Sequence, residues 1–299
     1  MAELIRVHPE VRAALEARRP VVALETTLVA HGFPRGEGAA VAAEGERRVR
    51  AAWAVPATVG VIDGVIQVGL TEEQLERFGD SPDARKVGPR DLAACAAQGE
   101  LGATTAGATL AVCRAVGVGF LGTGGLGGVH RGWTRRPDVS ADLGELARTE
   151  ALVVASGAKS LLDVEATAEL LETIGVPVLG WRTETMPLFY ARDGGPPVSA
   201  RVLTVEETAQ IAQFHWRLGR HSALLLVRPP DESLDVEPLI AEGVEEAERQ
   251  GVRGPEVTPF VLAYLHEATG GRTVEANKKL VVENAALAAD VAVAYARLE

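Results

Sequence analysis

Short apolar runs alternate with longer amphipathic stretches along nearly the whole chain, and this alternation constrains the fold more than any other feature. The apolar runs have the length of buried strands, and the stretches between them show the apolar spacing of helices. The strand-like runs occupy residues 21–25, 117–122, 151–155, 177–181 and 223–227. Strands joined by helices predict an α/β fold, in which helices cover both faces of a mixed, largely parallel sheet.

The last third of the chain is predicted to be mainly helical, over residues 205–217, 237–250, 258–268 and 274–297. We therefore expect a three-layer α/β/α architecture with a helical C-terminal third. Neither a Pro/Ser-rich linker nor an internal repeat divides the 299 residues, which predicts a single domain over residues 1–299.

Local signals add detail to this outline. Asp63-Gly64 separates two apolar runs and predicts a β-hairpin, and Thr71 with Gln74 fits a capping box that opens a helix. Further helices are expected at residues 138–148 and 161–174. Glycine flanks the string at residues 85–88, which predicts a turn there.

Charge and composition exclude several classes of function. The net charge is −11 and no basic stripe is present, so a nucleic-acid polymer is not an expected partner, although a small phosphorylated metabolite is compatible. Apolar runs are far shorter than the roughly 20 residues that cross a bilayer, and the N-terminus lacks a signal-peptide pattern. We expect no membrane association and a cytoplasmic location. Cys95 and Cys113 lie in alanine-rich helical stretches and are interpreted as small buried apolar residues.

Lysine is scarce: the 30 basic residues include four lysines, at positions 86, 159, 278 and 279, and 26 arginines. A lysine amine can lose its proton and attack a carbonyl carbon, whereas an arginine keeps its charge. Two interpretations fit this scarcity. Either a codon bias favours arginine, or some of the four lysines are retained for chemistry.

Two strand ends place reactive groups where ligands bind in α/β folds. Glu25 ends an apolar strand, where partial burial would raise its pKa and allow it to donate a proton; the alternative is a strand-end side chain turned to water. Lys159 follows the apolar run at residues 151–155 in small apolar company, and such surroundings favour the neutral, nucleophilic amine. A lysine exposed at a helix start is the alternative there, and the helix dipole disfavours it.

Three further strings suggest binding. Five glycines within residues 122–128, followed by His130 and Arg131, form a loop whose N–H groups could approach a phosphate; the resemblance to a dinucleotide fingerprint is loose. The string from Asp138 to Asp142 has two interpretations: Asp138 and Ser140 could cap a helix, or Asp138, Ser140 and Asp142 could offer oxygen ligands to Mg²⁺ or Mn²⁺.

Asn277 and Asn284 lie seven residues apart and so share one helix face. Their amides could bind a uracil-like base or cap neighbouring loops.

Several strings, in this order, resemble those of the pseudouridine-5′-phosphate glycosidase family, also called the indigoidine synthase A-like family. They are Ala-Leu-Glu-Thr-Thr at 23–27, Gly-Ala-Thr-Thr at 102–105, Thr-Gly-Gly-Leu-Gly-Gly-Val-His-Arg-Gly at 123–132, Asp-Val-Ser-Ala-Asp-Leu at 138–143, Gly-Ala-Lys-Ser-Leu-Leu-Asp at 157–163 and Leu-Glu-Thr-Ile-Gly-Val-Pro-Val at 171–178. The resemblance covers nearly the whole chain.

The resemblance implies reversible cleavage of pseudouridine 5′-phosphate to uracil and ribose 5-phosphate by a homotrimer with one divalent metal, usually Mn²⁺, per subunit. It makes Lys159 the nucleophile that forms a Schiff base with ring-opened ribose, and Glu25 the proton donor and acceptor. It assigns the metal to Asp138 and the contacts with a small phosphorylated nucleoside to Lys86, Ala106, His130, Ser140, Ala141, Asp142 and Asn277.

The chain departs from the family pattern at four places. Gly88-Pro89 stands for Ser-Arg, the segment 181–187 reads Trp-Arg-Thr-Glu-Thr-Met-Pro for Tyr-Gln-Thr-Asp-Glu-Phe-Pro, Arg228 stands for an Asn, and Glu283 for another Asn. These changes fall where substrate shape is expected to be read. Two alternatives therefore stay open: a lysine Schiff-base enzyme for another C-glycoside or phosphorylated sugar, and a non-catalytic sugar-phosphate-binding protein.

Overall fold

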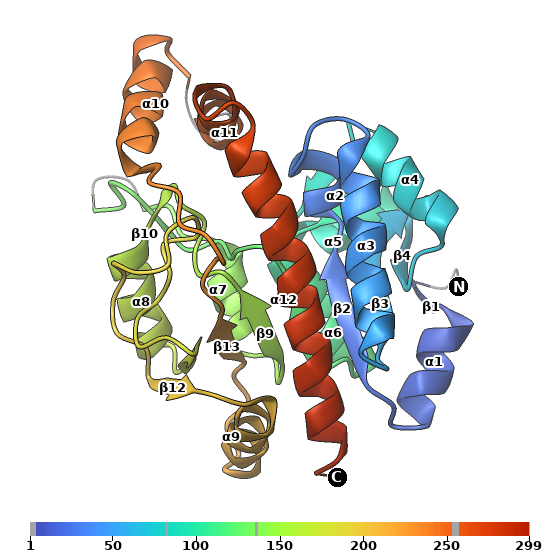
Figure 1. Cartoon of the computed structure of the whole chain (residues 1–299). Helices are drawn as coiled ribbons and strands as arrows, with labels where there is room; N and C mark the ends of the chain where they lie inside the picture. Colours follow the sequence, from blue (N-terminus) through green and yellow to red (C-terminus); the bar gives the residue numbers. More distant parts are fainter. Residues whose placement is uncertain (1–3, 82, 135–136, 253–256, 299) are drawn as a thin grey trace.

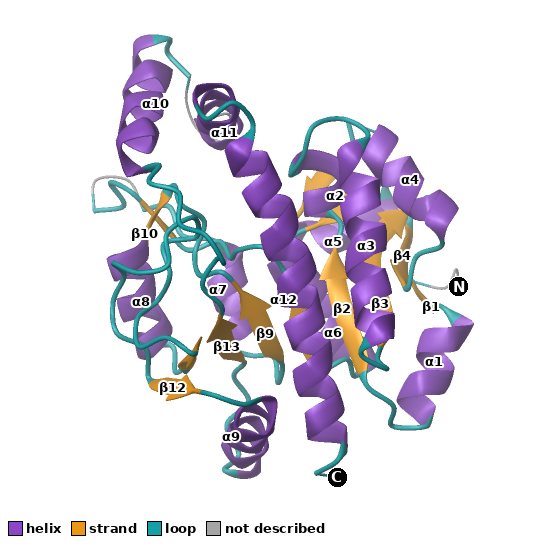
Figure 2. Cartoon of the chain, in the orientation of Figure 1, coloured by secondary structure: helices purple, strands orange, loops and turns teal. Residues whose placement is uncertain are grey.

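The computed structural model describes residues 4–81, 83–134, 137–252 and 257–298, and within them the strands form one large sheet and one small sheet (Figures 1 and 2). Along its main path the large sheet has the order β1-β4-β3-β2-β7-β9-β13-β11-β12, with β6 pairing β3 and β5 pairing β6. Its strands are β1 (Ile5–Val7), β2 (Val21–Glu25), β3 (Val55–Ile62), β4 (Val65–Val68), β5 (Arg85–Val87), β6 (Gly102–Thr104), β7 (Phe120–Gly122), β9 (Leu152–Ala155), β11 (Val178–Trp181), β12 (Ala200–Val202) and β13 (Leu224–Val227). In the small sheet, β8 (Val129–His130) pairs with β10 (Leu162–Asp163).

The sheet is mixed but largely parallel, as the sequence predicts. The strands from β3 through β2, β7, β9, β13 and β11 to β12 are parallel neighbours, whereas β3 is antiparallel to both β4 and β6. Asp63-Gly64 makes the predicted hairpin turn between β3 and β4, with positive φ at both residues. The predicted capping box at Thr71 and Gln74 is also present.

Helices lie on both faces of the sheet (Figure 1). On one face they are α3 (Glu37–Ala51), α9 (Val205–Arg217) and α12 (Arg272–Ala296). On the other they are α1 (Pro9–Glu16), α5 (Leu92–Ala97), α6 (Ala106–Val116), α7 (Ala141–Leu146) and α8 (Val164–Thr173). Near the edge of the sheet lie α2 (Thr27–His31), the 3₁₀ turn η1 (Pro89–Asp91) and α4 (Glu72–Asp80); α10 (Glu237–Arg249) and α11 (Val257–Ala268) pack on each other.

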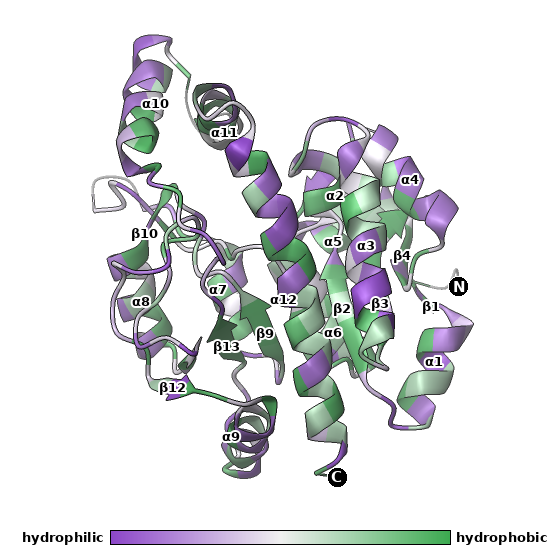
Figure 3. Cartoon of the chain, in the orientation of Figure 1, coloured by the Kyte–Doolittle hydropathy of each residue, from purple (hydrophilic) through white to green (hydrophobic). Residues whose placement is uncertain are grey.

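Successive strand residues enter opposite apolar layers, because side chains alternate across a strand. In β9, Leu152 and Val154 pack with α9 and α12, whereas Val153 and Ala155 pack with α6 and α7. Such a strand reads as a continuous apolar run, which is the pattern of a sheet covered on both faces. Figure 3 shows β9 and β13 in the green of hydrophobic residues. The predicted α/β/α architecture with a helical C-terminal third is thus confirmed.

Several local predictions were wrong. The segment 85–88 is largely strand β5 and not a turn, because residues 85–87 pair with β6. Helix α7 starts at Ala141 and not at Asp138, since Ser140 adopts an extended backbone and caps it. Residues 162–163 form β10, and α8 begins only after its cap, Asp163. No helix of the described residues is long and apolar enough to cross a membrane.

Helix α12 approaches the sheet closely at Gly122, the last residue of β7. A Cβ at this position would lie 2.7 Å from Ala285 Cα, which is backbone and cannot turn aside. We expect Gly122→Ala to lower the free energy of unfolding by about 1–3 kcal/mol, the usual cost of overpacking a core. Urea denaturation would measure it, with Gly119→Ala as the control, because a Cβ there meets no atom within 4 Å. Equal stability of the two variants would contradict the expected clash.

Candidate active site

The carboxyl ends of three adjacent parallel strands, β2, β7 and β9, meet at the centre of the sheet. Glu25 ends β2, the glycine-rich loop at residues 122–128 follows β7, and the loop that carries Lys159 follows β9. Ligands bind at this edge of open α/β sheets, so the sequence-predicted groups gather where the fold places a site.

Glu25 is 5% exposed, which excludes the alternative of a strand-end side chain turned to water. The hydroxyl of Thr123, in the glycine-rich loop, donates a hydrogen bond to Glu25 Oε1. Burial raises the pKa of the Glu25 carboxyl. The positive charge of Lys159 and the bond from Thr123 oppose this rise, while the charge of Asp142 adds to it. Glu25 is therefore a buried carboxyl that holds a proton more readily than an exposed one.

The loop that carries Lys159 runs alongside the glycine-rich loop. Ser156 N–H donates to Gly124 O at 2.9 Å, Leu126 N–H to Gly157 O at 3.0 Å, and Lys159 N–H to Leu126 O at 3.0 Å. Gly157 has φ +82°, and a Cβ there would lie 2.5 Å from Pro187 O, so the turn before Lys159 requires glycine. Lys159 is half-buried.

Lys86 reaches the same cluster from β5. The residue as a whole is exposed, yet the protein around its amine removes enough water to lower its pKa. The charge of Lys159 lowers this pKa further, whereas the charges of Asp142 and Glu25 oppose it. Glu25, Lys86, Asp142 and Lys159 therefore form one electrostatic cluster, although they lie far apart in the sequence.

The Asp142 carboxylate is already engaged by the protein. Its Oδ1 accepts from Gly107 N–H at 2.8 Å and its Oδ2 from Gly127 N–H at 2.9 Å, so it ties the start of α6 to the glycine-rich loop. Ser140 Oγ accepts from Asp142 N–H at 3.2 Å, which confirms the helix-capping alternative for this residue. Ala106 begins α6 next to Gly107 and is buried, as is Asp142, whereas Ala141 is exposed.

Asp138 and His130 lie together, outside this electrostatic cluster. Asp138 Oδ2 is 4.0 Å from His130 Nδ1, and the Asp138 side chain is 63% exposed. In the part of the chain that the structure describes, no group of three or more His, Cys, Asp or Glu residues could hold a metal ion. A cation at Asp138 would therefore draw most of its ligands from water or substrate, which hard divalent cations accept.

The two asparagines of α12 differ in their surroundings. Asn284 is fully buried, and its Nδ2 lies within 3.3 Å of three acceptors in the two loops, which is the loop-capping alternative. Asn277 is half-buried, and its Oδ1 is shielded from water with no hydrogen-bond partner. This Oδ1 would lie 3.2 Å from a Cβ on Gly124, so it faces the glycine-rich loop. Asn284 Oδ1 is likewise buried without a partner, but the Asn284 nitrogen is held by the two loops, so Asn277 is the less engaged of the two amides.

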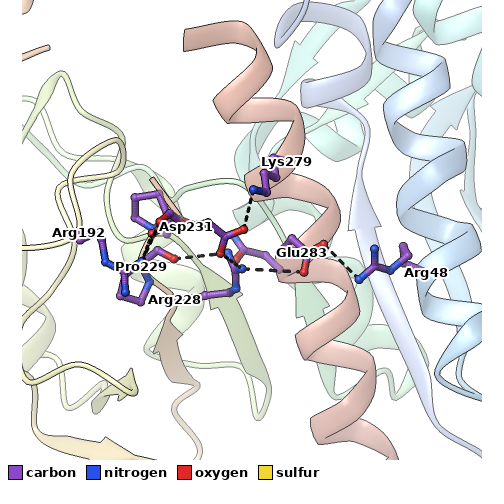
Figure 4. Close-up of polar contacts among 10 residues, drawn as sticks. Arg48, Arg192, Arg228, Pro229, Asp231, Lys279 and Glu283 are labelled. Atoms are coloured by element: carbon purple, nitrogen blue, oxygen red, sulfur yellow. Dashed lines mark hydrogen bonds and ion pairs between the residues drawn. The ribbon is translucent and has the colours of Figure 1, made fainter. Parts of the chain in front are cut away.

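Two of the departures from the family pattern, Arg228 and Glu283, are neighbours (Figure 4). Arg228 Nη2 lies 3.9 Å from Glu283 Oε2 and 2.7 Å from Asp231 Oδ1. Glu283 also pairs with Arg48 at 3.1 Å, and Asp231 with Lys279 at 2.9 Å. The network joins the loop after β13 to α12 and α3. It borders a cavity of about 590 Å³ that Arg228, Asp231 and Lys279 help to line, and neither Glu25 nor Lys159 lines this cavity.

Sequence reasoning missed Thr123, whose hydroxyl binds Glu25, and left the role of Asn284 undecided. Thr123 is fully buried and is the first residue after β7. The available signal was a hydroxyl residue between a strand end and a run of glycines. Thr26 was also missed: its Oγ1 donates to Val59 O at 2.8 Å and lies 3.3 Å from Thr104 Oγ1, which ties the end of β2 to β3 and β6.

Comparison with known proteins shows the family of this chain. The family model described as indigoidine synthase A like protein matches residues 10–294. A pseudouridine-5′-phosphate glycosidase of Escherichia coli strain K12 is 42% identical over 99% of this chain and 97% of its own, and one of Symbiobacterium thermophilum is 46% identical over 98% of each.

Among solved structures, the prealnumycin C-glycosynthase AlnA in complex with ribulose 5-phosphate superposes with a TM-score of 0.92 at 37% identity, over 100% of this chain and 99% of its own. An indigoidine synthase A-like protein of Thermotoga maritima gives 0.87 at 38% identity, over 97% and 96% of the two chains. The resemblance read from the sequence motifs is thereby confirmed, and the chain belongs to the indigoidine synthase A-like protein family.

Proposed function

We propose that this enzyme reversibly cleaves the carbon–carbon glycosidic bond of pseudouridine 5′-phosphate, giving uracil and ribose 5-phosphate. The observation that carries the proposal is the pairing of a lysine with a buried, proton-holding carboxyl at the ends of β9 and β2. The relatives named pseudouridine-5′-phosphate glycosidase support the substrate, and the complex of the C-glycosynthase with ribulose 5-phosphate supports a pentose phosphate.

The chemistry explains why a lysine is needed. In a C-glycoside the leaving atom is a ring carbon, so the usual protonation of a glycosidic oxygen by one of two carboxylates does not help. We propose that the neutral amine of Lys159 attacks C1′ as the ribose ring C–O bond breaks, and that a proton of the attacking nitrogen passes to the released ring oxygen. The nitrogen electron pair then forms a C1′=N iminium as the bond to the uracil carbon breaks, while Glu25 gives that carbon a proton. Water hydrolyses the iminium, which releases ribose 5-phosphate and restores the lysine.

Other residues would bind and orient the substrate. Lys86 offers a cation to the sugar or phosphate, and His130 lies in the segment that follows the glycine-rich loop. The region around Ala106, Ser140, Ala141 and Asp142 would present backbone groups, since both Asp142 oxygens already accept N–H groups. The free Asn277 Oδ1 would accept a hydrogen bond from a base N–H.

One experiment separates this function from its alternatives. The protein is incubated with uracil, ribose 5-phosphate and Mn²⁺, trapped with borohydride, and the adduct is located by mass spectrometry. An adduct on Lys159 together with pseudouridine 5′-phosphate supports the proposal. An adduct without that nucleotide indicates a Schiff-base enzyme for another C-glycoside or sugar phosphate, and the absence of any adduct excludes both.

A divalent cation, Mn²⁺ by the resemblance, is proposed at Asp138. Asp138 fits this role because its carboxylate is exposed and forms no ion pair with an arginine or lysine in the described residues. Water would complete the coordination shell of the cation. When bound, the cation would supply positive charge to a phosphate or a sugar oxygen.

We expect Asp138→Asn to weaken Mn²⁺ binding about tenfold or more, since loss of even an outer-shell partner has effects of that size. Free Mn²⁺ measured by electron paramagnetic resonance during titration would report it without any assay of activity. Asp163→Asn is the matched control. The Asp163 side chain caps α8 by accepting the Ala166 N–H, and an asparagine oxygen can accept the same bond, so this variant should leave Mn²⁺ binding unchanged. Unchanged Mn²⁺ affinity in the Asp138 variant would exclude this residue as the ligand.

The homotrimer and the cytoplasmic location stay predictions. The homotrimer follows from the family resemblance alone.

A further inference from the structure

Asn284 occupies the point where the two loops of the active site leave the sheet. Its side-chain nitrogen lies 2.8 Å from Thr123 O, 3.1 Å from Ser156 Oγ and 3.3 Å from Gly124 O. An amide nitrogen has two hydrogens, so one of them is shared between two of these acceptors. All three acceptors lie in the segments that directly follow β7 and β9.

Two of these acceptors belong to residues that contact one proposed catalytic group, Glu25, or lie close in the chain to the other, Lys159. The hydroxyl of Thr123 donates to Glu25, and Ser156 stands three residues before Lys159. The hydrogen bonds of Asn284 reach neither Glu25 nor Lys159 themselves. Whatever Asn284 does for the reaction, it therefore does through the loops.

The helix that carries Asn284 cannot shift easily toward or away from these loops. Ala285 is fully buried, and its backbone lies against Gly122 at the end of β7. A fully buried side chain on a packed helix has few rotamers available, so its hydrogen bonds fix their acceptors in place.

We propose that Asn284 is a positioning residue, which holds Thr123 and Ser156 so that the Glu25 carboxyl and the Lys159 amine address the same substrate carbon. This inference rests on the proposed function. It goes beyond that function because it gives Asn284 a role in the geometry of the reaction without any contact with substrate.

The pH dependence of the rate gives a readout that a purely structural role would not move. The bond from Thr123 lowers the pKa of Glu25, so loosening Thr123 should raise this pKa. The charged groups that face Glu25 are Lys159, Lys86 and Asp142, and variants at position 284 leave all three in place. Because Glu25 must be protonated to donate, the basic limb of the cleavage profile should move to higher pH.

Two variants at this position and one at Thr123 test the proposal. Asn284→Ala removes the donors, and Asn284→Asp keeps the shape but has at most one hydrogen to donate in place of two, because a carboxyl buried among these acceptors favours its protonated form. We expect both to lower kcat by about 10²-fold, the scale of a misplacement of roughly 1 Å, with a smaller change in KM. Both should also shift the basic limb upward and slow borohydride trapping of ribose 5-phosphate on Lys159.

Thr123→Val separates the two loops. It removes the hydroxyl but keeps the carbonyl that Asn284 binds, so the basic limb should shift while trapping on Lys159 stays at the wild-type rate. This variant keeps the proposal testable if an Asn284 variant fails to fold. Glu275→Ala, an exposed change on the same helix, is the control and should match wild type in both assays.

The outcomes distinguish this inference from the proposed function. If wild type forms no adduct on Lys159, the proposed function fails. If wild type forms it, a wild-type pH profile and trapping rate in the Asn284 variants overturn the positioning role, as does a loss that follows thermal stability alone. A wild-type basic limb in Thr123→Val also overturns it.

Discussion

Replacement of Lys159 by arginine is expected to abolish turnover while leaving the charge of the site intact. Arginine keeps its proton, so it cannot attack C1′ or form a Schiff base. The loss in kcat should be roughly 10⁴-fold or more, the scale seen when a covalent nucleophile is removed. The rate of uracil release from pseudouridine 5′-phosphate would measure this loss.

The retained charge makes this variant informative. Lys159 lowers the pKa of Glu25 through its positive charge, and arginine would preserve that influence. A loss of activity then reports on the missing nucleophile and not on a changed carboxyl. Lys279→Arg on α12 is the matched control, because that side chain is 56% exposed and pairs with Asp231. Substantial turnover in Lys159→Arg would remove the Schiff-base mechanism.

Glu25→Gln is expected to separate the two halves of the reaction. The amide keeps the size of the carboxyl and can still meet the Thr123 hydroxyl, but it cannot supply a proton. Cleavage of the C–C bond should fall by about 10²–10⁴-fold, the usual contribution of a general acid. Borohydride trapping of ribose 5-phosphate on Lys159 should continue, because an imine with the free sugar needs no C–C bond to break.

The raised pKa of Glu25 determines how activity should change with pH. Burial raises the pKa of Glu25 above its usual range, and the protonated form is the one that donates in the direction of cleavage. Activity should be present at low pH and fall as the pH rises through this raised value, and the limb should vanish in Glu25→Gln.

The control is Glu46→Gln, which alters another carboxyl whose pKa burial raises and which accepts a hydrogen bond from Thr58 at 2.5 Å, outside the site. An unchanged limb in Glu25→Gln would assign the proton to another group.

The central strands and most helices could be predicted from the sequence because burial on both faces leaves a strong pattern. Residues 205–217 form α9 with the predicted ends, and β2 covers the predicted residues 21–25. The short strands β1, β5, β6 and β12 could not be predicted, because three residues show no periodicity, whereas the equally short β7 ends a longer apolar run. Lys86 shows the consequence: its string looks like a turn, and only pairing with β6 makes it a strand.

The site divides in the same way. Glu25 and Lys159 could be chosen from the sequence because Glu25 ends an apolar run and Lys159 lies in the short loop after another. The role of Asp142 could not be predicted, because the N–H groups that its carboxylate binds belong to Gly107 and Gly127, which are 35 and 15 residues away in the chain. Asn284 was left undecided for the same reason: its closest acceptor, Thr123 O, is 161 residues away.

The position of α12 has a consequence for how the chain folds during synthesis. This last helix covers the middle of the sheet, against β2, β7 and β9, and not an edge (Figure 1). Until the ribosome has released residues near 285, the apolar sheet surface around Leu24 and Val154 has no cover from it. A nascent chain that already contains all the described strands of the sheet still exposes this apolar surface, and partly folded chains of this kind aggregate or bind chaperones. Cover of this sheet face therefore depends on the synthesis of residues near 285, well after β13, the last strand of the sheet in chain order, has been made.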